Sequence, residues 1–259
     1  VCNQLTANGI AHAELGGVLP NPRLSLVREG IELAKREGID LVLAIGGGSV
    51  IDSAKAIGLG TVSEGDVWDY FIGEREPEHT LPVAVLLTCP ATGSESSQVA
   101  VVNNTDEGKK LLVSHPVLRP KYAFMDPELT YTLPEYQTMC GCVDIMMHTM
   151  ERYFTNGGNM EITDSIAEGL MRTVIENARI LVRDPKNYDA RAEVMWAGSL
   201  SHNGLTGCGA VVGGDFASHA LEHEIGGIYD VAHGAGLAAI WGSWARYVYK
   251  DCLPRFEKF

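Results

Sequence analysis

Three consecutive glycines, Gly46, Gly47 and Gly48, stand between a short apolar run and a helical pattern, and this junction constrains the fold most. The run Asp40–Ile45 is typical of a strand buried on both faces, as found in parallel sheets covered by helices. Glycines let the backbone approach a ligand closely, and the amides that begin the next helix favour a pyrophosphate. A tight strand-to-helix turn capped by Ser49 is the alternative, and the pattern is not G-x-G-x-x-G.

The rest of the first half alternates helical and strand patterns. Leu24, Val27, Ile31 and Ala34 recur three or four residues apart, which is the stripe of an amphipathic helix. We therefore expect an α/β fold class for this half. The expected elements are helices over 24–36 and 50–57 and strands over 40–45, 83–87, 99–103, 111–113 and 122–125.

The pattern becomes helical throughout near residue 132. Thr132 and Glu135 fit a capping box, in which a hydroxyl and a carboxylate satisfy the first free amides of a helix. Long helices are expected over 135–154, 162–182 and 188–205, with a last one from about His233. We therefore predict two domains, an α/β domain over 1–131 and an all-helical domain over 132–259.

Composition excludes several classes of protein. The formal net charge of -13 repels phosphate backbones, so no nucleic-acid partner is expected. No stretch is apolar for long enough to cross a membrane, and no signal peptide begins the chain, so a cytoplasmic protein without membrane contact is expected. The six cysteines are scattered without Cys-x-x-Cys pairs, which favours reduced thiols that pack in the fold.

A second loop, after the strand expected at 83–87, is rich in hydroxyl groups. Thr88, Thr92 and Ser94 lie beside a glycine and could contact phosphate, ribose or carboxamide groups. A loop that only caps the following helix would have the same composition. The loop alone therefore leaves both interpretations open.

Two polar residues on the helix expected at 135–154 could hold a metal ion. Asp144 and His148 are four residues apart, so both project from one face. Glu151 and Arg152 lie near the same sector of the helical wheel, however, and a solvated face is the alternative.

Histidines cluster in the last quarter of the sequence. His219, His223 and His233 are three of the eight histidines in the chain, and the first two are four residues apart. One carboxylate with two or three imidazoles is a ligand set suited to Fe²⁺ or Zn²⁺, with an open position for a substrate oxygen. We expect such a site in the cleft between the two halves.

Taken together, these motifs resemble the iron-containing (group III) alcohol dehydrogenases. The resemblance covers essentially the whole chain in family order, and within the family it favours the butanol dehydrogenase and NADPH-dependent aldehyde reductase branch. The stretches that carry the family resemblance are Gly46–Lys55, Ala91–Glu95, Asp144–His148 and His219–Gly234, and those that favour the branch are Pro20–Arg23, Asp126–Pro127 and Asn187–Tyr188.

The resemblance implies an architecture like that of dehydroquinate synthase, with a dinucleotide-binding domain, a helical domain and a metal between them. It implies that Asp144, His148, His219 and His233 are the metal ligands. His223 matches a further histidine with a proton-relay or substrate-contact role. The cofactor residues implied are Gly46, Gly47, Gly48 and Ser49 for the pyrophosphate, Thr88 and Thr92 for the nicotinamide side, Lys110 for the nicotinamide ribose, and Asp52 for cofactor binding and catalysis.

The activity implied is metal-dependent, NAD- or NADP-linked interconversion of primary alcohols and aldehydes, in a homodimer. Family members carry a further strand before the first segment seen here and further helices after the last, so a chain truncated at both ends is expected. A related enzyme of the same architecture, either a polyol dehydrogenase acting on glycerol-type substrates or a cyclising synthase that borrows NAD, is one alternative. A truncated, non-catalytic relative that serves as a binding module is the other.

Overall fold

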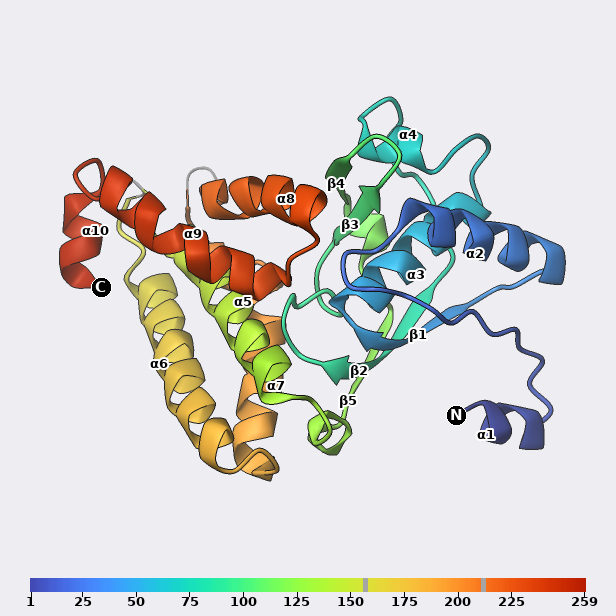
Figure 1. Ribbon diagram of the computed structural model, residues 1–259, viewed down its shortest axis with the longest axis horizontal. Helices are drawn as coiled ribbons and strands as arrows, with labels where there is room; N and C mark the ends of the chain where they lie inside the picture. The colour runs from blue at the N-terminus through green and yellow to red at the C-terminus, as the bar shows by residue number, and fades with distance from the viewer. Residues whose placement is uncertain (156–157, 211–212) are drawn as a thin grey trace.

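A computed structural model describes residues 1–155, 158–210 and 213–259 of the chain. Strands and their covering helices occupy one side of the molecule, and a group of helices occupies the other (Figure 1). The expected fold class, an α/β N-terminal part followed by a helical C-terminal part, is confirmed.

A parallel three-stranded sheet forms the centre of the α/β part. β1 (Val42–Gly47), β2 (Val83–Cys89) and β5 (Tyr122–Met125) lie in the order β1-β2-β5, all parallel. Helix α3 (Gly48–Thr61) packs on this sheet through an apolar cluster that includes Ile51. The apolar strands thus form a buried parallel layer, as their composition predicts.

A hairpin forms a second, two-stranded sheet. β3 (Val99–Asn104) and β4 (Lys109–Ser114) are antiparallel, and Asn103 pairs with Lys110. The hairpin, α2 (Leu24–Glu37), α3 and the short α4 (Trp68–Phe71) share one hydrophobic core. A further short helix, α1 (Cys2–Ala7), begins the chain. Lys110 is thereby held on the side of the α/β part that contacts α8.

Six α-helices make up the described residues of the C-terminal part, with α5 packed against α6, α7 and α9. Within the described residues, no helix combines the length and the apolar character that crossing a membrane requires. Short 3-10 turns occur at Pro116–Leu118, Pro127–Thr130 and Leu205–Gly207. The helices are α5 (Glu135–Tyr153), α6 (Glu161–Arg183), α7 (Tyr188–His202), α8 (Ala217–Tyr229), α9 (His233–Val248) and α10 (Leu253–Lys258).

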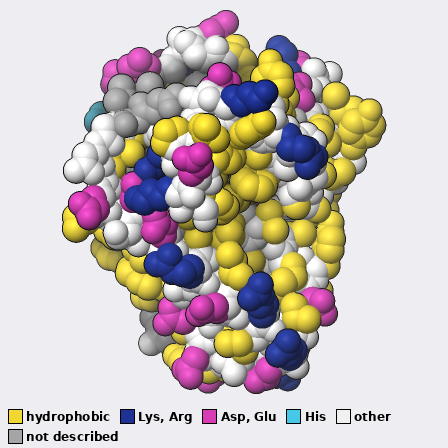
Figure 2. All heavy atoms as spheres, turned by 90° about the vertical axis from the view of Figure 1, so that its left-hand side faces the viewer, with side chains coloured by type: hydrophobic (Ala, Val, Ile, Leu, Met, Phe, Trp, Pro, Cys, Tyr) yellow, Lys and Arg dark blue, Asp and Glu magenta, His cyan; other side chains and the backbone are white. Residues whose placement is uncertain are grey.

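The helical part also presents apolar groups to solvent on the side away from the α/β part. Figure 2 shows hydrophobic side chains running between patches of both charges on this face. In the helical part, Ile162 of α6 and Tyr247 of α9 are strongly exposed, at 75% and 86%.

The capping box predicted at the start of α5 is wrong. Helix α5 begins at Glu135, its N-cap is Pro134, and no side chain caps it. A capping box needs its hydroxyl at the N-cap and its carboxylate three helical positions later. Here Glu135 is the first helical residue, so neither side chain occupies the required position.

The triple glycine forms a direct junction between strand and helix. β1 runs through Gly47 and α3 starts at Gly48, with Gly47 in an extended conformation at φ -97°. A Cβ on Gly47 would lie 2.8 Å from the Cβ of Cys89, and one on Gly48 would lie 2.5 Å from Oγ1 of Thr92. The glycines are therefore required for close approach to the neighbouring loop, and an unusual φ angle plays no part.

A glycine also sets the contact between α5 and α9. A Cβ on Gly234 would lie 2.1 Å from the carbonyl oxygen of Cys140, and backbone atoms cannot move aside cheaply. We expect Gly234→Ala to lower the free energy of unfolding by about 1–3 kcal/mol because of this overpacking. Gly169→Ala in α6 is the control, since its Cβ would meet nothing within 4 Å and alanine favours a helix. Urea unfolding measures both, and equal stability of the two variants would contradict the packing described.

Candidate metal centre and nucleotide pocket

Helix α5 carries Asp144 and His148 on one buried face. Asp144 is 2% exposed and His148 is 5% exposed. The alternative of a solvated face is wrong, because Glu151 and Arg152 are also buried, at 1% and 8% exposure. The sector of α5 that the helical wheel left undecided is therefore interior.

Imidazoles from two other helices converge on the same carboxylate. Oδ1 of Asp144 lies 3.4 Å from Nδ1 of His148 and 3.5 Å from Nε2 of His219, which is in the first turn of α8. The same oxygen lies 3.6 Å from Nε2 of His233, the first residue of α9. The structure thus brings together the four residues predicted as metal ligands, from positions up to 89 residues apart between 144 and 233.

The donor atoms fit a metal ion and lack other partners. Among the described residues, Oδ1 of Asp144, Nδ1 of His148 and Nε2 of His219 are buried without any hydrogen-bond partner. A buried polar atom without a partner costs about 1–3 kcal/mol. A tetrahedral ion with bonds of about 2.0–2.1 Å would separate its ligand atoms by roughly 3.3 Å. The observed spacing and the three free donor atoms therefore match a divalent cation.

A second set of residues, which sequence reasoning missed, orients the imidazoles. The Glu151 carboxylate accepts the backbone N–H of His219 at 3.1 Å and also contacts its Nδ1. Glu222 contacts Nδ1 of His233 in the same way. A carboxylate on the far nitrogen fixes the ring orientation of a metal-binding histidine. The signal in the sequence was their spacing, since Glu151 follows His148, and Glu222 follows His219, by one helical turn.

His202 and Arg152 complete the wall behind His148. The ring centroids of His148 and His202 are 4.0 Å apart, and Arg152 contacts Nδ1 of His202 at 3.3 Å. Arg152 also donates to the carbonyl oxygens of His148 and Ser201, at 2.8 and 2.9 Å. These contacts tie the end of α7 to α5.

Burial and charge set the protonation of the imidazoles. Burial, with smaller effects from His202 and His219, lowers the pKa of His148 well below its ordinary value, so its lone pair is available. Burial also lowers the pKa of His219, but the neighbouring carboxylates of Asp144 and Glu151 outweigh that effect and raise the pKa to about 9. The negative charge that favours a proton there would equally favour a cation.

A pocket of about 310 Å³ opens beside these groups, between the two halves of the chain. The α/β part contributes Gly48, Ser49, Asp52, Thr92 and Lys110 to its lining, and the helices contribute Asp144, His223 and His233. Three predicted cofactor residues, Gly46, Gly47 and Thr88, lie in β1 and β2 and are not among the lining residues that the structure describes. Gly46 and Gly47 belong to the junction between β1 and α3, and Thr88 lies near the end of β2.

Several polar groups at the pocket wall have partners within the protein. Asp52 accepts hydrogen bonds from Ser94 Oγ at 2.6 Å and from the Val101 backbone N–H at 3.0 Å. The buried Lys55 ammonium donates to Ser94 Oγ at 2.8 Å. Burial raises the pKa of Asp52, and the nearby Lys55 partly offsets that effect. One oxygen of Asp52 therefore holds the second loop against α3 and the other holds strand β3 there, which supports a structural role for Asp52 beside the pocket.

His223 lines the same pocket as an uncharged group. Burial first, and then the neighbouring charges of Lys110 and His233, lower its pKa to about 3. At neutral pH its ring is an acceptor as well as a donor.

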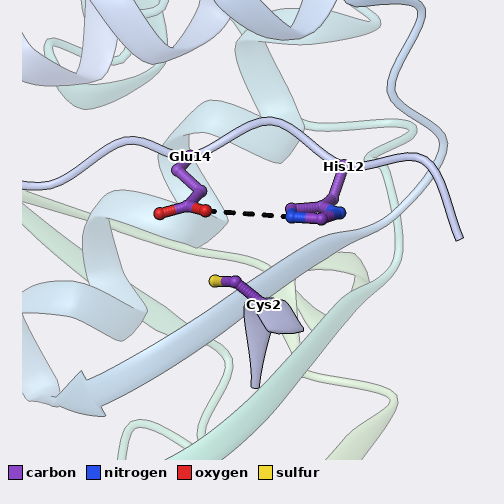
Figure 3. A group of neighbouring side chains, drawn as sticks. All are labelled: Cys2, His12 and Glu14. Atoms are coloured by element: carbon purple, nitrogen blue, oxygen red, sulfur yellow. Dashed lines mark ion pairs between the residues drawn. The ribbon is translucent and has the colours of Figure 1, made fainter. Parts of the chain in front are cut away.

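Another group of possible ligands lies at the N-terminal segment. Cys2, His12 and Glu14 point toward one another (Figure 3), with Nε2 of His12 3.8 Å from a carboxylate oxygen of Glu14. His12 and Glu14 are exposed, whereas Asp144, His148 and His219 are all buried. Exposed groups keep their hydration, so they do not need an ion as the buried set does. The Asp144 group is therefore the better metal centre.

Comparison with known proteins now identifies the family. Residues 1–127 match the family model described as iron-containing alcohol dehydrogenase. Residues 138–259 match the model of the C-terminal part of the same family. The chain belongs to the iron-containing alcohol dehydrogenase family.

Individual relatives from the butanol dehydrogenase and aldehyde reductase branch are similar over nearly the whole chain. The chain is 43% identical over 256 residues to NADH-dependent butanol dehydrogenase A of Clostridium acetobutylicum, covering 98% of this chain and 65% of the relative. It is 37% identical over 235 residues to the NADPH-dependent aldehyde reductase YqhD of Escherichia coli, covering 90% and 60%. The chain thus spans just under two thirds of the length of these two relatives.

A solved structure shows the same fold. NADH-dependent butanol dehydrogenase A from Thermotoga maritima superposes with a TM-score of 0.97 at 43% identity, over 100% of this chain and 64% of that one. The dehydrogenase fold predicted from the family resemblance is therefore confirmed.

Proposed function

We propose that this chain belongs to an NAD(P)-linked oxidoreductase that interconverts primary alcohols and aldehydes by hydride transfer at a bound divalent metal. One observation carries the proposal: among the described residues, three ligand groups with buried, unpartnered donor atoms meet His233 beside a pocket that Gly48 of the glycine junction also lines. The names of the butanol dehydrogenase and aldehyde reductase relatives support the substrate class.

The nucleotide is proposed to bind on the α/β side of the pocket. The N-terminus of α3, a helix of 14 residues, presents Gly48 and Ser49 to the pocket, and such a terminus favours a pyrophosphate. Thr92 and Lys110 line the same side and are proposed to face the nicotinamide end. We still predict a cofactor-binding role for Gly46, Gly47, Thr88 and Asp52, and a catalytic role for Asp52.

The division into two domains between residues 131 and 132 is likewise proposed, since the sheets precede it and the long helices follow it.

Asp144, His148, His219 and His233 are proposed to hold Fe²⁺ or Zn²⁺. Such an ion, when bound, supplies a Lewis acid that polarises the oxygen of an alcohol or aldehyde. The chain's own groups then orient the site: Glu151 and Glu222 fix two imidazoles, and Asp144 lowers the net charge. His223, uncharged and in the pocket, is proposed to accept or pass on the hydroxyl proton.

The proposed activity is tested with protein stripped of metal and then reloaded with Fe²⁺ or Zn²⁺. We expect oxidation of NADH or NADPH that depends on both butanal and metal, and little reduction of NAD⁺ or NADP⁺ by glycerol. Turnover with glycerol but not butanal would favour the polyol alternative. Metal and nucleotide binding without turnover on either substrate would favour a non-catalytic binding module.

A homodimer in the cytoplasm stays a prediction that rests on the family resemblance. Sedimentation velocity tests the assembly state, and a monomer at micromolar concentration would contradict a dimer.

A further inference from the structure

The Glu222 carboxylate occupies a position between two sites. Glu222 lies one helical turn after His219 in α8 and is fully buried, at 0% exposure. Its Oε2 contacts Nδ1 of His233 and also accepts a hydrogen bond from the Lys110 ammonium at 3.1 Å. One carboxylate oxygen is therefore shared by a metal-site imidazole and a lysine of the α/β part.

The surrounding backbone leaves this carboxylate little freedom. A Cβ on Gly226 would lie 2.8 Å from Oε1 of Glu222 and 2.9 Å from Nζ of Lys110. A Cβ on Gly236, in α9, would lie 2.8 Å from Cγ of Glu222. Glycines on two helices thus enclose the ion pair closely, so that any side chain at either position would displace it.

The two partners of Glu222 face the same pocket from different elements. Lys110 is on β4 and His233 begins α9, and both line the pocket. The side chains of Lys110 and Glu222 are 4% and 0% exposed, so their charges are poorly screened by water. Lys110 and Glu222 together form a buried ion pair of zero net charge next to the pocket that Lys110 lines.

We propose that Glu222 is a positioning residue shared by the metal centre and the nucleotide side of the pocket. It holds the ring of His233 toward Asp144 and neutralises Lys110 where a nucleotide would bind. This inference rests on the proposed function, because it assigns Glu222 a part in both of the binding events proposed there.

Glu222→Gln keeps the size of the side chain and removes its charge. The metal should bind more weakly by about 10–100-fold, because the imidazole loses its orienting carboxylate. The anionic nucleotide should bind more tightly, by about threefold or more, because Lys110 is no longer neutralised. Opposite changes in metal affinity and nucleotide affinity distinguish this role from a merely structural one, because a structural defect would weaken the binding of both metal and nucleotide.

The experiment measures Zn²⁺ affinity by chelator competition, and NADH and NADPH affinity of the metal-free protein by fluorescence titration. Glu224→Gln is the matched control, since Glu224 is exposed on the same helix, and both affinities should stay unchanged. Glu151→Gln should weaken only the metal, because among the described residues the Glu151 carboxylate is hydrogen-bonded to His219 alone. Lys110→Met provides a second variant of the pair and should weaken nucleotide binding without weakening Zn²⁺ binding.

Weaker Zn²⁺ binding together with tighter nucleotide binding in Glu222→Gln would support the proposal. Affinities like those of Glu224→Gln, or loss of metal affinity alone as in Glu151→Gln, would overturn it. A wild-type protein that binds neither Zn²⁺ nor Fe²⁺ would instead overturn the proposed function on which it rests.

Discussion

The His219→Ala variant is expected to lose its divalent metal and its turnover while keeping its affinity for the nucleotide. His219 offers a buried Nε2 without a partner among the described residues, and it lies 3.5 Å from Oδ1 of Asp144. Loss of an orienting group alone weakens metal binding by about 10–100-fold, and loss of a direct ligand should cost more. We therefore expect metal affinity and turnover to fall by at least about 100-fold.

Metal content by elemental analysis, together with nucleotide titration, measures this effect. His79→Ala is the matched control, because His79 is exposed and lies outside the pocket lining. The ligand assignment would be wrong if the His219 variant kept the metal content and the rate of the control.

The Gly48→Val variant is expected to do the reverse, losing the nucleotide and keeping the metal. A Cβ at this position would lie 2.5 Å from Oγ1 of Thr92, at the N-terminus of α3 that faces the pocket. The branched side chain would occupy the place proposed for the pyrophosphate. We expect the nucleotide Kd to rise by at least about 100-fold, which corresponds to about 2.7 kcal/mol.

Gly16→Val controls for the loss of a glycine, since a Cβ there would meet nothing within 4 Å. The metal content of the Gly48 variant serves as an internal test of folding. An unchanged nucleotide Kd in a variant that retains metal would exclude the glycine junction as the nucleotide site.

Most secondary-structure elements could be predicted from the sequence, because the residues buried in them are the apolar ones that form a continuous run or recur at helical spacing. The apolar run before Gly46 is β1, and the stripe from Leu24 to Ala34 lies in α2. The helix predicted from about His233 begins at that residue. The start of α5 could be placed but its capping could not, since the exact N-cap decides which side chains reach the free amides.

The candidate site was predictable only in part. Asp144 and the histidines are rare polar groups in apolar surroundings, so their spacing indicated a site before any fold was known. Glu151 and Glu222 stand one helical turn after His148 and His219, but this spacing does not show that they are buried, which depends on how α9 packs against α5 and α8. A shared contact such as that of Glu222 with Lys110, 112 residues away, has no local signal in the sequence.

Anomalous diffraction from crystals of the Zn²⁺- or Fe²⁺-loaded protein tests the central claim most directly. We expect one strong metal peak about 2.0–2.2 Å from donor atoms of Asp144, His148, His219 and His233. A peak at Cys2, His12 and Glu14 with none at Asp144, or no peak at all in loaded crystals, would contradict the account.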